Sequence, residues 1–178
     1  MATEAVGNDC QGARVWEAHA RTVVVDGVLH LGPTQASAAV RMSLFVDTSI
    51  WYAAADKSDA SNSRAKAVLS GGEPLVTTDH ILVETWTLIR HRLGRRAAEW
   101  FWEGLRSGAA TVETVGAADL DTAWEIGQSY RDQDFSIVDR TSFAVMRRLG
   151  IERAASLDDG FAIFRYGPNR RRAFTVVR

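Results

Sequence analysis

The chain has 178 residues, of which 46% are hydrophobic and 24% are charged, and its formal net charge is −1 at pH 7. This composition suits one globular domain with a core of its own. It excludes a membrane-spanning protein, because no apolar run approaches the roughly 20 residues that cross a bilayer. The single cysteine, Cys10, excludes an internal disulfide. Because the first residues also lack the pattern of a signal peptide, we expect a cytoplasmic protein.

Residues 1–41 differ in character from the rest of the chain. They hold one short strand-like run, at 21–31, and no sustained hydrophobic period. Met42 then stands directly before the apolar run SLFV. We therefore expect residues 1–41 to be an N-terminal extension, non-native or weakly ordered, and residues 42–178 to form the functional domain. A structured N-terminal hairpin is the alternative.

From Met42 onward the pattern alternates between strands and helices. The expected strands are 43–47, 75–77, 110–115, 151–157 and 173–177. The expected helices are 49–55, 60–69, 80–92, 95–106, 117–131 and 137–149. Strands that alternate with helices of this length indicate an α/β fold with a parallel sheet covered on both faces. In such sheets the functional site lies at the carboxyl ends of the strands.

Two of the expected helices carry large apolar side chains. Helix 80–92 is apolar nearly all round, which predicts that it is buried. Helix 95–106 has an apolar stripe that includes Phe101 and Trp102, whereas Trp100 lies on its polar side. Trp100 is therefore a candidate exposed aromatic for a partner or an RNA base, and half-buried packing is the alternative.

Four acidic residues stand at or inside the apolar segments. Asp47 follows the first strand, Glu84 lies in helix 80–92, Asp139 begins helix 137–149, and Asp158 follows strand 151–157. A carboxylate in an apolar setting is costly unless it is compensated, and several gathered together repel one another. A hard divalent cation would compensate both effects. The four acids therefore predict a metal-dependent site.

Each acid also has a structural explanation. Asp47 could be a helix N-cap or an Asx turn, although Thr48 and Ser49 could cap in its place. Ser136 and Asp139 have the spacing of a capping box, but Asp139 also shares the face of its helix that carries Phe143.

The other two acids have explanations of the same kind. Glu84 could pair internally with an arginine such as Arg140. The Asp158-Asp159-Gly run could be a simple turn. Rival catalytic motifs are missing from the sequence: there is no HExxH pair, no Gly-rich phosphate loop and no G-x-S-x-G elbow. A phosphatase with Asp47 as nucleophile would want a second acid at the position of Ser49.

Arginine carries almost all of the positive charge, since only Lys57 and Lys66 among the 21 basic residues are lysines. Arginine suits bidentate recognition of phosphate. The codons of a GC-rich genome explain the same bias, and placement at helix C-termini explains several positions. The candidates for RNA contact are Arg90, Arg92, Arg95, Arg96, Arg147, Arg148 and the run Arg170–Arg172.

Four segments together resemble the PIN domain and, within it, the VapC-type toxins of bacterial toxin–antitoxin pairs. They are FVDTSIWYAAAD, HILVETWTLIR, DFSIVDRTSFAVMRRLG and SLDDGF, which cover essentially Met42 to the C-terminus. The resemblance implies a three-layer α/β/α sandwich with a central parallel sheet. It also implies a Mg²⁺- or Mn²⁺-dependent endoribonuclease that cleaves tRNA or ribosomal RNA and inhibits growth until a VapB-like antitoxin binds it. Residues 1–41 have no place in the family pattern.

The same resemblance implies roles for the acids. Asp47, Asp139 and Asp158 are expected to hold the metal, and Glu84 completes the acidic pocket. The closing motif has an Asp three residues before a Phe, which selects Asp158 and leaves Asp159 as the alternative. Such toxins are often homodimers, so we expect one here. The rival hypothesis is an inactive PIN-fold module that binds RNA or protein without cleaving it.

Overall fold

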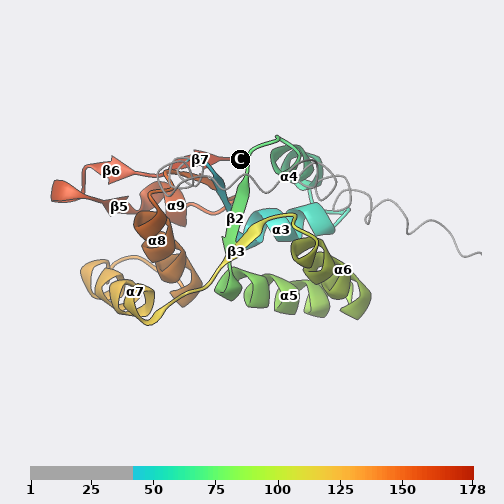
Figure 1. Cartoon of the computed structure of the whole chain (residues 1–178), viewed down its shortest axis with the longest axis horizontal. Helices are drawn as coiled ribbons and strands as arrows, with labels where there is room; N and C mark the ends of the chain where they lie inside the picture. Colours follow the sequence, from blue (N-terminus) through green and yellow to red (C-terminus); the bar gives the residue numbers. More distant parts are fainter. Residues whose placement is uncertain (1–41) are drawn as a thin grey trace, which may run out of the picture.

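A five-stranded parallel sheet runs through residues 42–178, the part of the chain that the computed structural model describes (Figure 1). Its order is β3-β2-β1-β4-β7, and every neighbouring pair is parallel. The strands are β1 (Leu44–Val46), β2 (Leu75–Thr78), β3 (Thr111–Glu113), β4 (Arg153–Ala155) and β7 (Thr175–Val177). The expectations for residues 1–41 lie outside the described residues.

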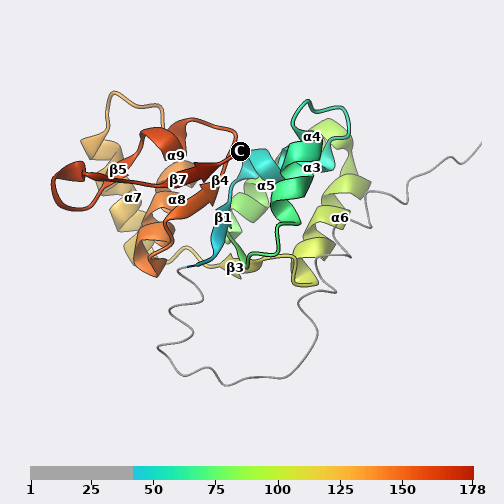
Figure 2. The same ribbon diagram turned by 90° about the horizontal axis from the view of Figure 1, so that it is seen from above.

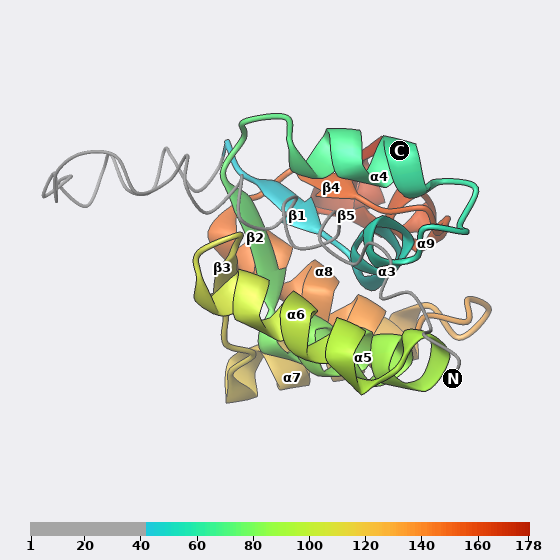
Figure 3. The same cartoon turned by 90° about the vertical axis from the view of Figure 1, so that its right-hand side faces the viewer.

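Helices cover both faces of this sheet. On one side lie α3 (Thr48–Ala55), α4 (Asn62–Leu69), α5 (Asp79–Leu93) and α6 (Arg95–Arg106). On the other side lie α7 (Ala117–Ser129), α8 (Ile137–Leu149) and the short α9 (Gly160–Ile163). Figures 1 and 2 show the two groups separated by the strands, and Figure 3 shows α5 beside α6. The expected α/β/α sandwich with a central parallel sheet is confirmed.

The point where the strand order reverses is formed by β1 and β4. The chain runs from β1 outward through β2 to β3, and then returns to β4 on the other side of β1. Val46 pairs with Ala155, so the residues that follow the two strands, Asp47 and Ser156, emerge side by side. Open parallel sheets bind their ligands at such a switch point, outside the carboxyl ends of the strands.

Aromatic packing on the α7–α9 side fixes the segment that follows β4. Phe143 of α8 stacks on Phe164, with ring centroids 4.3 Å apart, and meets Phe161 edge-on at 5.0 Å. Phe174 joins the same cluster from the C-terminal end of the chain. All four rings are buried. This cluster holds α9 against α8 and thereby positions the Asp158–Asp159 turn that precedes α9.

Two expectations about helix burial are wrong. Only Ile81, Thr85 and Ile89 of α5 are buried, and Val83 is 61% exposed, because α5 packs through one stripe. In α6 Trp102 lies outside the buried stripe and is 44% exposed. The alternative given for Trp100 holds: it is half-buried, with the Arg96 guanidinium 4.5 Å from its ring centroid.

The C-terminal segment differs most from expectation. The single strand expected at 173–177 is divided into β6 (Arg172–Ala173) and β7, and Phe174 between them is buried. β6 pairs antiparallel with β5 (Arg165–Tyr166), and the 3₁₀ turn η1 (Pro168–Arg170) joins the two. This hairpin and α9 were not expected. No helix within residues 42–178 is long and apolar enough to cross a membrane.

Candidate active site

A cleft of ≈ 540 Å³ opens at the switch point and brings all four predicted acids together. It is lined by Asp47, Thr48, Ser49, Tyr52, Asp59, Glu84, Leu88, Ser136, Asp139, Leu157 and Asp158. These residues come from the ends of β1 and β4 and from helices on both faces of the sheet. Residues far apart in the chain therefore converge on one surface, as the sequence predicted.

Asp47 is the most buried of these acids, with 5% of its surface exposed. It is the N-cap of α3 and accepts from the Ser49 backbone N–H at 3.3 Å, so the N-cap explanation of Asp47 holds, and Thr48 and Ser49 do not take its place. The hydroxyls of Ser49 and Ser156 also donate to its Oδ2, at 2.6 and 2.9 Å. Burial nevertheless raises the pKa of Asp47 from 3.8 to about 6, and the charge of Asp158 adds to the rise.

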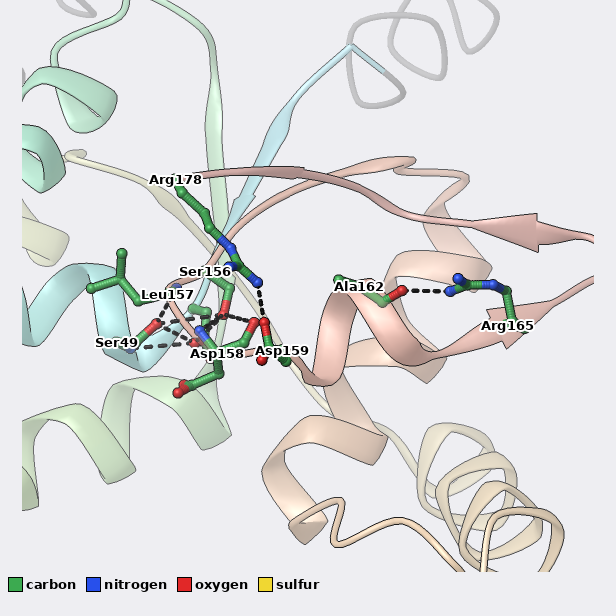
Figure 4. Close-up of polar contacts among 9 residues, drawn as sticks. Ser49, Ser156, Leu157, Asp158, Asp159, Ala162, Arg165 and Arg178 are labelled. Atoms are coloured by element: carbon green, nitrogen blue, oxygen red, sulfur yellow. Dashed lines mark hydrogen bonds and ion pairs between the residues drawn. The ribbon is translucent and has the colours of Figure 1, made fainter.

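Two serines tie the loop after β4 to the start of α3. The Leu157 N–H donates to Ser49 Oγ at 2.9 Å, and the Asp158 N–H donates to Ser156 Oγ at 3.1 Å (Figure 4). The same hydroxyls hold Asp47, so one network orients the first and the last acid of the cleft together. Ser156 was not predicted; its only signal in the sequence is a small polar residue directly after the apolar pair Ala154-Ala155.

Asp139 begins α8 with the capping box that its spacing suggested. The Ser136 N–H donates to Asp139 Oδ2 at 2.8 Å, and the Asp139 N–H donates to Ser136 Oγ at 3.0 Å. Its side chain also lines the cleft, so the capping and cleft interpretations hold together. Burial raises the pKa of Asp139 despite these bonds, and the charge of Asp158 raises it further.

Glu84 reaches the cleft from the middle of α5. Its Oε2 accepts a hydrogen bond of 2.5 Å from the Thr48 hydroxyl, and Thr85 donates to that hydroxyl at 3.3 Å. The alternative pairing with Arg140 is not among the ion pairs of the described residues, and the Arg140 Nε instead donates to the Ser136 carbonyl. Glu84 is therefore linked to the residue that follows Asp47.

The two consecutive aspartates after β4 have different surroundings. Asp158 lines the cleft, and its charge acts on both Asp47 and Asp139. Asp159 forms an ion pair with Arg178 near the C-terminus, outside the cleft lining (Figure 4). The geometry therefore favours Asp158 over Asp159 as the fourth acid.

The donor set of the cleft suits a hard divalent cation. Three carboxylates within electrostatic reach of one another, two of them with raised pKa, would each be stabilised as anions by a cation. Within residues 42–178 no three potential ligands are already gathered round one point. However, the hydrogen bonds described for Asp47 and Asp139 all use Oδ2, which leaves Oδ1 of each for a ligand.

Two further residues of the cleft were missed from the sequence. Tyr52 lies one helical turn after Thr48 on α3, and its hydroxyl donates to Asp56 at 3.1 Å. Asp59 comes from the loop between α3 and α4. The i, i+4 spacing of Thr48 and Tyr52 is the signal that could have found Tyr52; the Asp59 loop offers no such pattern.

Several of the candidate RNA-binding arginines are engaged by protein groups. Arg148 pairs with the buried Asp119 at 3.0 Å, and with Glu113 at 3.7 Å. Arg172 pairs with Glu152, and Arg95 pairs with Glu99 at 3.8 Å. Arg90 lies over the ring of Trp86, at 5.7 Å from its centroid. These contacts give Arg148 and Arg172 structural roles that the charge pattern alone did not reveal.

Comparison with known proteins identifies similar chains. Residues 44–165 match the family model of the PIN domain. The chain is 41% identical over 120 residues to proteins named 23S rRNA-specific endonuclease VapC20 from two strains of Mycobacterium tuberculosis, covering 67% of this chain and 92% of theirs. The crystal structure of M. tuberculosis VapC20, described as a sarcin-ricin-loop-cleaving toxin, superposes with a TM-score of 0.65. It is 40% identical, and the match covers 67% of this chain and 93% of that one.

Proposed function

Because the chain belongs to the PIN domain family, we propose that it is a metal-dependent endoribonuclease that cleaves the sarcin-ricin loop of 23S ribosomal RNA. The observation that carries the proposal is the convergence of Asp47, Glu84, Asp139 and Asp158 on one cleft. The names of the relatives support ribosomal RNA. They give no support to tRNA, the other substrate expected from the sequence.

In this proposal Asp47, Asp139 and Asp158 hold Mg²⁺, or Mn²⁺ in its place. When bound, such an ion supplies a polarised water and neutralises charge on the phosphate under attack. Ser49 and Ser156 orient Asp47 and the backbone at Asp158 through their hydroxyls. These hydrogen bonds limit the rotation of the Asp47 side chain and fix the backbone that carries Asp158, so the site needs little rearrangement to bind its ligands.

Glu84 is the group we assign to accept a proton from the attacking water. No histidine lines the cleft formed by the described residues, so the carboxylates are the protein groups there that are suited to accept this proton. The Thr48 hydroxyl holds Oε2 of Glu84, and the described hydrogen bonds leave Oε1 open to solvent molecules in the cleft. Thr48 thereby fixes the direction in which Glu84 acts.

The names of the relatives also support a proposal about the biological role of the protein. We propose that the protein is a toxin that inhibits growth until a cognate VapB-like antitoxin binds it, that it works in the cytoplasm, and that it forms a homodimer. Exposed apolar side chains on α5, α7 and α8 support a protein partner, since Val83, Trp124 and Ile137 are each more than half exposed. An inactive binding module is disfavoured, because it has no reason to gather four like charges in one cleft, with Asp47 buried among them.

The proposal is tested with a synthetic RNA stem-loop of the sarcin-ricin sequence. We expect the purified full chain to cut it at one position with Mg²⁺ present, to lose all cutting in EDTA, and to regain it when Mg²⁺ or Mn²⁺ is added in excess. Mapping of the RNA 5′ ends locates the cut, and an unrelated stem-loop and a tRNA transcript are the controls. Cutting that persists in EDTA, or equal cutting of all three RNAs, would contradict the proposal.

A further inference from the structure

A second hollow, of ≈ 170 Å³, lies between α7, the end of α8 and the β5–β6 hairpin. Three arginines, Arg147, Arg165 and Arg170, line it together with the aromatic rings of Tyr130 and Tyr166. Glu125 is the one carboxylate in its lining. This arginine hollow is therefore a concave site with an excess of positive charge, and none of its residues lines the cleft of acids.

The turn of the hairpin has an uncommon backbone. Asn169 and Arg170 are consecutive non-glycine residues with positive φ, 55° and 52°. This left-handed region is unfavourable for most side chains, and an arginine is placed there only when the surroundings enforce it. The result is that the Arg170 side chain turns back over α7, where its guanidinium lies 4.6 Å from the ring centroid of Tyr130. Such local strain often marks a functional element.

The arginines of the hollow keep donors free for a ligand. Arg165 contacts the carbonyls of Ala162, Ile163 and Phe164 through Nη1 alone. Arg170 donates to the Ser129 carbonyl through Nη2, at 3.4 Å. A guanidinium has five N–H donors in a planar fork, so the remaining edge of each is available among the contacts described for residues 42–178. No hydrogen bond or ion pair is described there for Arg147.

The contacts to backbone carbonyls offer a purely structural explanation, in which Arg165 and Arg170 close the ends of α9 and α7. That explanation does not cover Arg147, which is exposed on the last turn of α8 and still faces the same hollow. Nor does it need an arginine at position 170, where the backbone is unfavourable. The neighbouring Arg172 is neutralised by Glu152, so the positive charge is concentrated on the three residues that line the hollow.

We propose that the arginine hollow binds a backbone phosphate of the RNA substrate, away from the bond that is cleaved. The inference rests on the proposed function. Asp139 stands in the first turn of α8 and Arg147 in its last turn, so about 12 Å of helical rise separates the cleft from the hollow along α8. A strand that lies in the cleft can therefore reach the hollow with a phosphate a few nucleotides away from the bond that is cleaved.

RNA fits this hollow better than an acidic protein segment. Guanidinium forks bind phosphate oxygens bidentately, and Tyr130 and Tyr166 add ring faces against which a ribose or base can pack. The acidic cleft repels a polyanion and cannot retain RNA by charge alone. A separate basic site would attract the RNA backbone and hold it near the cleft. The turn and β6 also lie beyond residue 165, where the match to the family model ends. The hollow is thus partly built from chain outside that match.

The test measures RNA binding without cleavage. In the full chain carrying Asp47→Asn, the affinity for the sarcin-ricin stem-loop is measured by fluorescence anisotropy over a series of salt concentrations. We expect Arg147→Gln and Arg170→Gln each to weaken binding about three- to tenfold and to lower the salt slope by about one. Arg147→Lys should restore much of both. The control is Arg64→Gln, an exposed arginine on α4, which should change neither.

The outcomes separate the two proposals. If the wild-type chain does not cut the stem-loop and the Asp47→Asn chain does not bind it, the proposed function fails and the inference falls with it. If the wild type cuts the stem-loop and the Asp47→Asn chain binds it, but the arginine variants keep its affinity and salt slope, the inference alone is overturned, including the case where they lose a protein partner instead. Because Arg170 contacts the chain, thermal unfolding is measured in parallel. Should Arg170→Gln unfold the protein, Arg147→Gln decides, since no contact described in residues 42–178 holds that side chain.

Discussion

Asp47→Asn is expected to reduce RNA cleavage by at least about 10³-fold while making the metal-free protein more stable at neutral pH. The loss of activity follows because the amide cannot act as an anionic ligand for a divalent cation. The gain in stability follows from burial, which raises the pKa of Asp47 to about 6. The folded state therefore prefers the protonated acid, and ionising it above that pH costs free energy of folding.

Burial of Asp47 makes the folded protein less stable as the pH rises. The contribution of Asp47 to stability is complete below its unfolded pKa of 3.8 and is lost as the pH rises through about 6. One pKa unit corresponds to about 1.4 kcal/mol, so the loss reaches about 3 kcal/mol at pH 7–8. The Asp47→Asn variant does not lose stability in this way. In EDTA, its free energy of unfolding should therefore exceed that of the wild type by an amount that grows between pH 4 and pH 7.

Urea unfolding at several pH values measures this difference, and single-turnover cleavage measures the activity. Asp121→Asn is the matched control, because it makes the same change at an exposed position of α7. It should change neither quantity. Wild-type cleavage by Asp47→Asn, or a variant less stable than the wild type at pH 7–8 in EDTA, would contradict the account.

Asp139→Asn is expected to lower cleavage by about 10²- to 10³-fold with little change in stability. The amide oxygen of Asn can still accept from the Ser136 N–H, so the start of α8 remains capped. Asp139→Ala should lose the same activity and, in addition, about 1 kcal/mol of stability with the cap. The loss of activity shared by both variants measures the role of the Asp139 charge, and the additional loss of stability in Asp139→Ala measures its role as a cap.

The same two assays measure these variants, with Asp134→Asn as the control on an exposed acid of the preceding loop. If Asp139 served only as a cap, Asp139→Asn would cleave RNA as well as the wild type. That result would remove Asp139 from the site and leave the cleft with too few ligands for the proposed chemistry.

The parts of the fold that were predictable have strong local signals. The alternation of short apolar strands with helices of 8–15 residues indicated the parallel sheet, and α6 and α8 have the expected bounds. The site was predictable for the same reason. Asp47 and Asp158 follow strands, and parallel topology brings the ends of strands to one edge. The burial of α5 was misjudged because apolar residues occur on several of its faces, whereas only one face packs against the rest of the protein.

The unpredicted parts depend on contacts between distant residues. The hairpin of β5 and β6 has strands of two residues, which are too short for any periodic signal. Its position depends instead on the phenylalanine cluster around Phe143, which includes Phe164 directly before β5. Ser156 belongs to the site only because β4 pairs with β1. Likewise, Arg148 is structural because α7 places the buried Asp119 beside it, which no local pattern reveals.

The most direct test of the account is to locate the metal by the anomalous diffraction of Mn²⁺ in crystals of the full chain. We expect one or two manganese peaks in the cleft, bound directly or through water by Asp47, Asp139 and Asp158. Asp47→Asn crystals should lose these peaks. A protein that cuts RNA in Mn²⁺ while its manganese lies elsewhere, with the cleft free of metal, would contradict the central claim.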